Sequence, residues 1–207
     1  YAVAPAAAAI AAKLAHSMQT APHYYLTTDV DVGAAAALLE EVNAALPADE
    51  AVALNDLIIK ACERATRAVP AVNASWLDGG VVRRYARFDV NVVVGVGAGL
   101  AAPALVDVGS MGLADVAKAT KAAAAAAAGD DAPPYAAGTF TVQNLGAFGV
   151  ASAAPIVHTP QACALALGAV VETLAPAPDG GFVASPKLAA TLAADHRVVD
   201  GAVGAQW

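Results

Sequence analysis

Apolar side chains recur at helical spacing in several stretches of the chain. In residues 54–68, Ile59 and Cys62 fall on one face of a helix. Asn55 or Asp56 can cap its first turn, because both side chains accept hydrogen bonds from free backbone N–H groups. Spacing and alanine-rich helix propensity together predict helices over residues 6–18, 34–46, 54–68 and 113–128.

Runs rich in Val, Thr, Tyr and Phe lie between these helices, and Gly or Pro bounds each run. Such runs predict strands over residues 24–32, 75–77, 81–85, 88–96, 100–108, 139–144, 156–158, 163–172 and 188–194. The chain shows neither an internal repeat nor a linker long enough to divide it. We therefore expect one α+β domain over residues 1–207, with helices packed on a mixed β-sheet.

Composition narrows the classes of function. Hydrophobic residues make up 58% of the chain and aromatic residues 5%, so core volume must come from Val, Leu and Ile. No stretch of about 20 bulky apolar residues occurs, and a membrane span is not expected. The net charge is −7, and basic residues are scattered except for Arg83, Arg84 and Arg87. Nucleic acid is therefore not an expected partner.

The cysteines and histidines give little sign of a metal or disulfide site. Cys62 and Cys163 lie in apolar settings, which predicts buried free thiols, with a single disulfide as the alternative. His16, His23 and His158 have no Cys, Asp or His partner at the spacing of metal ligands. We expect no bound metal.

The segment with the clearest chemistry follows the last predicted strand. Here Asp195, Arg197 and Asp200 surround His196, and Gly201 is expected to form a turn. Neighbouring charges can fix one imidazole tautomer and leave the other nitrogen free as a base near neutral pH. The same pattern also occurs in turns whose charges only satisfy each other, and the residue types alone leave both interpretations open.

Residues 195–202, Asp-His-Arg-Val-Val-Asp-Gly-Ala, resemble the signature near the end of dihydrolipoyl acyltransferase catalytic domains. Further segments resemble the same family in the same order along the chain: residues 17–26, 54–61, 69–76, 138–146 and 160–163. Residues 22–26 and 160–163 look most like the mitochondrial acetyltransferase of pyruvate dehydrogenase. The favoured acyl group is therefore acetyl.

This resemblance implies a fold shared with chloramphenicol acetyltransferase, trimers with active sites between subunits, and assembly of trimers into a hollow cage. It implies coenzyme A as a substrate and a lipoyl group carried on an upstream domain, because no lysine here lies in an Asp-Lys turn. Pyruvate dehydrogenase and dihydrolipoamide dehydrogenase are the implied partners. The implied location is the mitochondrial matrix, with the plastid stroma as the alternative, and a final helix is implied after Trp207.

The resemblance also assigns roles to residues. His196 is expected to be the general base for a thiol substrate. Asp200 is expected to hold the geometry of the site, through an arginine such as Arg197, with Asp195 as the alternative partner of the histidine. The sequence does not decide between these two carboxylates.

Gln143 occupies the position where the family usually has a serine that stabilises the oxyanion. A fixed donor at such a position contributes roughly 3–4 kcal/mol to catalysis. The glutamine amide is also a donor, but its longer side chain must fold back or bond through water, and Asn144 beside it is expected to support the site. An active acetyltransferase core is the first hypothesis, and a structural core subunit with weak or no catalysis is the alternative.

Overall fold

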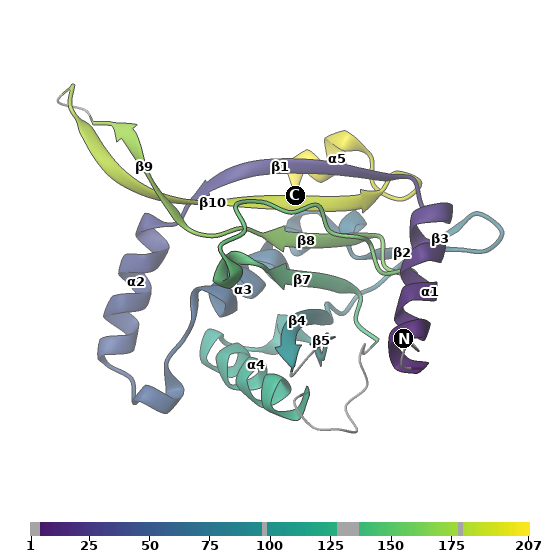
Figure 1. Cartoon of the computed structure of the whole chain (residues 1–207), viewed down its shortest axis with the longest axis horizontal. Helices are drawn as coiled ribbons and strands as arrows, with labels where there is room; N and C mark the ends of the chain where they lie inside the picture. Colours follow the sequence, from purple (N-terminus) through teal and green to yellow (C-terminus); the bar gives the residue numbers. More distant parts are fainter. Residues whose placement is uncertain (1–4, 97–98, 128–136, 178–179) are drawn as a thin grey trace.

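Helices and strands alternate along most of the chain. The computed structural model describes residues 5–96, 99–127, 137–177 and 180–207 (Figure 1). Its helices are α1 (Pro5–Thr20), α2 (Gly33–Ala44), α3 (Leu54–Ala68), α4 (Leu113–Ala127) and α5 (Gly201–Gln206). Its strands are β1 (His23–Asp31), β2 (Ala74–Leu77), β3 (Val81–Arg84), β4 (Val90–Val96), β5 (Gly99–Ala101), β6 (Ala104–Leu105), β7 (Phe140–Asn144), β8 (Cys163–Leu167), β9 (Val171–Pro176) and β10 (Phe182–Asp195).

The central sheet is mixed, as the sequence predicts. Its strand order is β1-β10-β8-β7-β4-β5, β6 also pairs with β4, and β9 pairs with the first half of β10. Strands β4, β7 and β8 run parallel, whereas β10 is antiparallel to β8 and to β1. Strands β2 and β3 form a separate hairpin, which lies beyond the end of β10 in Figure 1.

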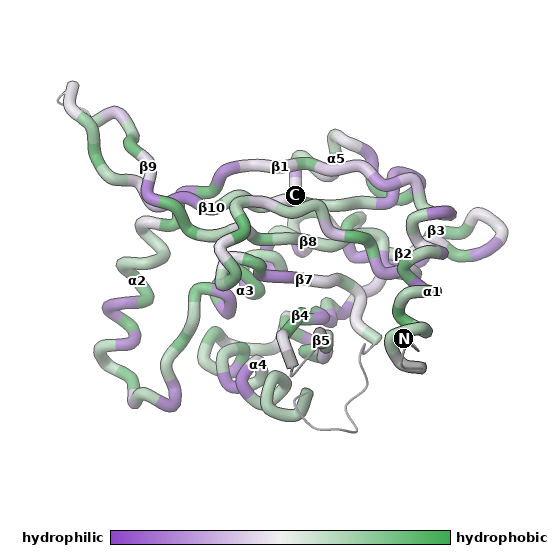
Figure 2. Tube along the Cα trace, viewed as in Figure 1, coloured by the Kyte–Doolittle hydropathy of each residue, from purple (hydrophilic) through white to green (hydrophobic). Residues whose placement is uncertain are grey.

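The core forms where α3 and α4 pack against the middle strands of the sheet. All five residues of β8 are buried, and Figure 2 shows hydrophobic residues along this strand and the adjoining part of β10. Ile59 and Cys62 are buried on the predicted face of α3, and Val142 and Phe140 are fully buried in β7. Each such side chain contributes about 1.5–3 kcal/mol through removal from water. None of the helices among the described residues has the length and apolar character needed to cross a membrane.

Two of the predicted strands are broken. The run 163–172 divides into β8 and β9 at Gly168, where an added Cβ would lie 1.9 Å from the carbonyl oxygen of Ala151. The run 100–108 divides into β5 and β6, because Pro103 between them has no N–H for a strand ladder. A 3-10 turn over Val108–Ser110 then ends this segment.

The prediction of a strand at residues 156–158 is wrong. The N–H of Val157 donates to Nε2 of His23 at 3.0 Å, and its carbonyl accepts from the hydroxyl of Ser17. These backbone groups therefore bond to side chains rather than to a neighbouring strand. Strand β10 is also much longer than predicted, since its first half forms the β9–β10 hairpin that projects from the body in Figure 1.

Helix ends differ from the predictions in two places. The N-cap of α3 is Ala53 rather than Asn55 or Asp56, although Asp56 still accepts a hydrogen bond of 2.9 Å from the N–H of Ala53. Gly201 was expected to form a turn and instead begins α5, with Asp200 as the N-cap. Both differences follow from side chains that satisfy free N–H groups of a first helical turn.

Candidate active site

His196 directly follows β10, at a position fixed by two backbone hydrogen bonds. Its own N–H donates to the carbonyl of Pro22 at 3.0 Å, and the N–H of Asp195 donates to the carbonyl of Ala162 at 2.8 Å. The His196 side chain is exposed, and the ring of Tyr24 meets it edge to face with 5.0 Å between centroids. Among the described residues, no hydrogen bond engages the imidazole nitrogens. The ring is therefore placed by its neighbours while its nitrogens stay open to a substrate.

Asp195 and Arg197, which flank His196 in the sequence, form a bidentate ion pair with each other. Nε and Nη2 of Arg197 donate to the two carboxylate oxygens at 2.9 and 2.6 Å, and the backbone N–H of Arg197 donates to Oδ1 at 3.0 Å. Asp195 is 2% exposed. Its hydrogen bond raises the pKa of the Arg197 guanidinium, which also lies 5.0 Å from the ring centroid of Trp76. This pair stiffens the turn without engaging the imidazole.

Asp200 shapes the other side of the turn. Its Oδ1 accepts from the N–H of Val203 at 2.8 Å, which caps α5, and its carbonyl accepts from the hydroxyl of Tyr24 at 2.7 Å. Among the described residues, Arg197 bonds to Asp195 and not to Asp200. The backbone carbonyl of Asp200 bonds to Tyr24, whose ring contacts the imidazole of His196.

Tyr24 is a residue of this site that the sequence did not single out. Burial, followed by the charges of Cys163 and Asp200, raises the pKa of the Tyr24 hydroxyl to about 12. The phenol therefore remains a hydrogen-bond donor throughout the neutral range. Its only sequence signal is its place in residues 17–26, one of the segments that resemble the acyltransferase family.

Gln143 and Asn144 lie at the opposite end of the sheet. Gln143 is in register with Ala166 of β8, and Ala166 is in register with Thr191 of β10. His196 is five residues beyond Thr191, or about 17 Å at about 3.3 Å per residue, and β7 is two strand spacings of about 4.8 Å from β10. The two side chains therefore start on the order of 19 Å apart in one chain.

Asn144 has a local role in the turn that follows β7. Its Oδ1 accepts from the N–H of Gly146 at 2.9 Å, which fixes this turn, and both Asn144 and Gln143 are half-buried. Among the described residues, the side chain of Gln143 has no hydrogen-bond partner. Its amide is therefore open to a group outside this chain.

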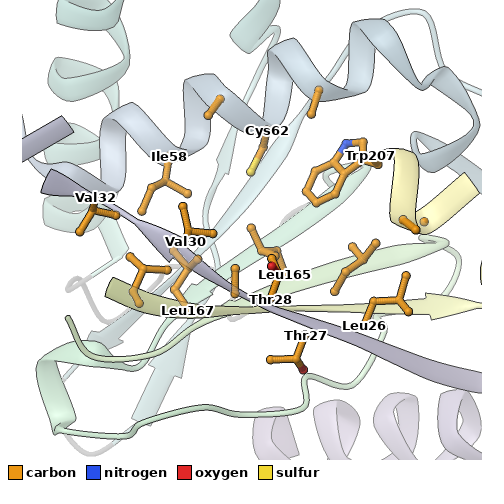
Figure 3. A pocket seen from close by; sticks show the side chains of 17 residues that line it. Leu26, Thr27, Thr28, Val30, Val32, Ile58, Cys62, Leu165, Leu167 and Trp207 are labelled. Atoms are coloured by element: carbon orange, nitrogen blue, oxygen red, sulfur yellow. The ribbon is translucent and has the colours of Figure 1, made fainter. Parts of the chain in front are cut away.

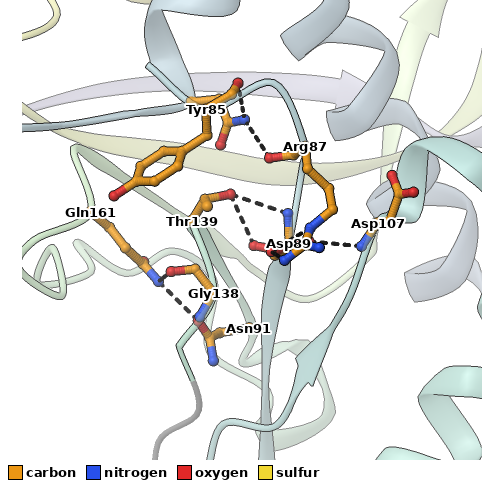
Figure 4. Close-up of polar contacts among 9 residues, drawn as sticks. Tyr85, Arg87, Asp89, Asn91, Asp107, Gly138, Thr139 and Gln161 are labelled. Atoms are coloured by element: carbon orange, nitrogen blue, oxygen red, sulfur yellow. Dashed lines mark hydrogen bonds and ion pairs between the residues drawn. The ribbon is translucent and has the colours of Figure 1, made fainter. Parts of the chain in front are cut away.

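A buried polar network supports the sheet end next to His196 (Figure 4). Nε2 of Gln161 donates to Oδ1 of Asn91 and to the carbonyl of Gly138, each at 2.9 Å. The hydroxyl of Thr141 donates to Oε1 of Gln161 at 2.6 Å. Gln161 directly precedes Ala162, whose carbonyl holds the end of β10. These bonds fix the backbone from which the histidine turn begins.

A separate apolar groove of about 520 Å³ lies between α3, α5 and the strands β1, β8 and β10. Figure 3 shows Ile58, Cys62 and Trp207 facing Leu165 and Leu167 across it. Burial raises the pKa of the Cys62 thiol to about 12, so this cysteine is not a reactive thiolate. Cys62 and Cys163 are both buried and free, which confirms the prediction for these residues.

His23 and His158 have structural surroundings. Nδ1 of His23 donates to the carbonyl of Ala21 at 2.7 Å, and its Nε2 accepts from Val157, so both nitrogens are used. His158 is 8% exposed, and burial followed by the charge of Lys13 lowers its pKa to about 4. Across the described residues, no group of three or more His, Cys, Asp or Glu side chains could hold a metal ion.

Comparison with known proteins places this geometry in a family. The family model of the 2-oxoacid dehydrogenases acyltransferase (catalytic domain) matches residues 2–207. The chain belongs to this family. It is 38% identical over 202 residues to the mitochondrial dihydrolipoyllysine-residue acetyltransferase component of the pyruvate dehydrogenase complex of Schizosaccharomyces pombe, with 96% of this chain and 42% of the relative covered. The corresponding protein of Dictyostelium discoideum is 40% identical, with 95% and 31% covered.

Solved structures agree with this acyltransferase assignment. The chain superimposes on a probable dihydrolipoamide acetyltransferase of Listeria monocytogenes with a TM-score of 0.91 at 23% identity, covering 100% of this chain and 89% of that one. For the Azotobacter vinelandii dihydrolipoamide acetyltransferase the TM-score is 0.86 at 25% identity, with 100% and 87% covered. That structure addressed the role of a serine, a histidine and an asparagine in catalysis.

Chloramphenicol acetyltransferase shares the same fold. The TM-score is 0.60 at 13% identity, with 94% of this chain and 89% of that one covered. The predicted α+β fold of chloramphenicol acetyltransferase type is therefore confirmed. The chain spans less than half the length of the two curated relatives.

Proposed function

We propose that this chain is the catalytic core of a dihydrolipoamide acetyltransferase, which transfers an acetyl group between a dihydrolipoyl thiol and coenzyme A. The observation that carries the proposal is the exposed imidazole of His196, which is held in place by Tyr24 and the backbone while its nitrogens have no partner in the part of the chain that the structure describes. The names of the relatives at 38% and 40% identity support the acetyl group and the lipoyl substrate.

The reaction needs a base because a thiol with a pKa of about 8.5 is only a few per cent ionised at neutral pH. His196 takes the proton from the thiol of coenzyme A, and the thiolate attacks the carbonyl carbon of the acetyl-dihydrolipoyl thioester. A new carbon–sulfur bond to coenzyme A forms as the bond to the lipoyl sulfur breaks. The imidazolium then returns the proton to that sulfur. Atoms, electrons and the proton balance in this reaction without an oxidant or a metal.

The site is completed by a second copy of the chain. His196 and Gln143 start on the order of 19 Å apart in one chain, too far to act on one carbonyl. A trimer in which His196 of one subunit faces Gln143 of a second subunit brings the base and an amide donor together. Stabilisation of the oxyanion by that donor is worth roughly 3–4 kcal/mol.

The proposed setting is the core of a pyruvate dehydrogenase complex in the mitochondrial matrix, with the plastid stroma as the alternative. The names of the curated relatives support this setting, and a solved structure similar to this chain is the cubic core of such a complex. Trimers would assemble into the cage, and pyruvate dehydrogenase and dihydrolipoamide dehydrogenase would bind to it. The lipoyl group would be carried on an upstream domain, and coenzyme A would enter as a substrate.

Gln143 favours a second candidate function, a structural core subunit with weak or no catalysis. The deciding experiment measures acetyl transfer from acetyl-CoA to dihydrolipoamide by the assembled protein. We expect His196→Ala to lower the rate at least about 10²-fold, the usual minimum for a general base, while the assembly persists. His16→Ala, which removes an exposed histidine of α1, serves as the matched control.

Mixed assemblies test the shared site. Chains with His196→Ala and chains with Gln143→Ala, refolded together, should recover part of the activity that each lacks alone, because some interfaces then combine an intact histidine with an intact glutamine.

No turnover by correctly assembled wild-type protein would establish the structural subunit instead.

A further inference from the structure

The β2–β3 hairpin carries two arginines that the proposed mechanism does not use. Arg83 and Arg84 are exposed, and among the described residues neither forms an ion pair. They are neighbours in a strand, so their side chains lie on opposite faces of the hairpin. Arg84 is in register with Ala74, and Arg83 is in register with Ser75. Any ligand that approaches one face therefore meets one arginine and not the other.

Arg84 lies on the same face as Trp76, which is two residues from Ala74. The guanidinium of Arg197 lies over the ring of Trp76 at 5.0 Å, so this face of the hairpin is turned toward the catalytic turn. Arg197 itself is neutralised by Asp195, whereas Arg84 retains a free charge. The single carboxylate of the hairpin, Asp78, lies in the turn beyond Trp76.

Backbone hydrogen bonds fix the distance between this face and the base. The N–H of Ala162 donates to the carbonyl of Ala74 at 2.9 Å, and the N–H of Asp195 donates to the carbonyl of Ala162 at 2.8 Å. The backbone at Arg84 is thus three strand spacings from Asp195, on the order of 14 Å. An anion bound by Arg84 would therefore lie away from the reacting atoms, at a distance that these backbone hydrogen bonds fix.

We propose that Arg84, on the Trp76 face of the β2–β3 hairpin, binds a phosphate group of coenzyme A. The proposal rests on the proposed acetyltransferase function and adds a specificity residue to it. In coenzyme A the pantetheine arm separates the phosphates from the thiol, so a phosphate site must lie back from His196. Arginine is suited to this role because its planar guanidinium donates two parallel hydrogen bonds to phosphate oxygens.

The overall charge favours a local cationic site for such a substrate. With a net charge of −7, the chain as a whole repels a polyanion, and a cationic side chain near the site would offset this repulsion. Arg87, the third member of the basic cluster, pairs with Asp89 through three hydrogen bonds. Of the three arginines in this cluster, Arg84 is therefore the one that is unpaired among the described residues and lies on the face turned toward the catalytic turn.

The test is titration calorimetry of the assembled protein with coenzyme A, 3′-dephospho-coenzyme A and pantetheine, the last of which has no phosphate. Arg84→Gln should raise the Kd for coenzyme A about tenfold, the scale of one lost charge-assisted hydrogen bond, and leave the Kd for pantetheine unchanged. Arg83→Gln removes the same charge from the opposite face and is the matched control. Comparison of the two coenzymes shows which phosphate is bound.

Each outcome decides the proposal. Equal weakening by Arg83→Gln and Arg84→Gln would overturn it in favour of a diffuse effect of net charge. Unchanged coenzyme A binding by Arg84→Gln would also overturn it, and a raised KM for a protein-bound lipoyl group in that variant would show that the hairpin instead binds an acidic carrier domain. If the wild type binds coenzyme A through Arg84 but transfers no acetyl group, the phosphate site stands and the catalytic proposal fails.

Discussion

The hydroxyl of Tyr24 donates a hydrogen bond of 2.7 Å to the backbone carbonyl of Asp200, 176 positions later in the chain. The same tyrosine places its ring 5.0 Å from the ring of His196, between centroids. One side chain thus connects the first strand of the sheet, the cap of α5 and the proposed base. It connects the backbone at Asp200 to the histidine, while the carboxylate of Asp200 caps α5.

We expect Tyr24→Phe to lower kcat several-fold with little change in the KM for coenzyme A, because the ring contact with His196 remains while the link to Asp200 is lost. The free energy of unfolding should fall by about 1 kcal/mol, the usual net value of one hydrogen bond. Denaturant unfolding and steady-state kinetics measure both effects. Tyr25→Phe is the control, since Tyr25 is 42% exposed on the same strand. Equal kinetics for the two variants would remove Tyr24 from the positioning of the base.

The buried His158 predicts a loss of stability at acidic pH. Burial lowers its pKa from 6.5 to about 4 in the folded protein, so the unfolded chain binds the proton first as pH falls. This histidine therefore destabilises the fold progressively between about pH 6.5 and pH 4, by at most about 1.4 kcal/mol per pH unit. The free energy of unfolding, measured in urea at several pH values across this range, should change less steeply with pH for His158→Gln than for wild type. The exposed His16→Gln should leave the slope unchanged.

Gly138 has no room for a side chain. A Cβ at this position would lie 2.2 Å from Oδ1 of Asn91 and 3.0 Å from the carbonyl of Asp89, inside the network of Figure 4. We expect Gly138→Ala to lower the free energy of unfolding by about 1–3 kcal/mol, the usual cost of overpacking. Gly95→Ala in β4, where a Cβ would meet nothing within 4 Å, is the control. Equal stability of the two variants would show that the network adapts.

The sequence predicts elements well where apolar spacing is regular. Helix α3 has the predicted bounds 54–68 because Ile59 and Cys62 give its buried face a clear period. The hairpin β9–β10 was missed because its strands mix alanine, proline and exposed apolar residues, which give no alternation between buried and exposed positions. The segment at residues 156–158 was misassigned because its hydrogen bonds go to Ser17 and His23, which local pattern cannot reveal.

The site was predictable only where its residues are close together in sequence. His196 and its flanking charges stand in one segment, and the sequence identified them together. Tyr24 and Trp76 reach the same turn from strands far away in the sequence, and only the fold brings them there. Sequence alone does not decide between Asp195 and Asp200, because the choice depends on which N–H groups and which guanidinium the folded chain presents to each.

Gln143 decides between the two candidate functions. If its amide donates to the oxyanion from a second subunit, Gln143→Ala should lower kcat about 10²–10³-fold, the usual scale for the loss of one such donor, with little change in KM. Gln143→Ser should then preserve or raise activity where the pocket fits a hydroxyl, since a shorter donor need not fold back. A glutamine that only fills space predicts a different pair of results, in which alanine leaves kcat unchanged and serine gives a clear gain. The assay compares kcat at equal assembly state, with Asn144→Ala as a control for damage to the turn held by its bond to Gly146. An unchanged kcat in Gln143→Ala would rule out the oxyanion role and leave His196 to act without a side-chain donor from β7.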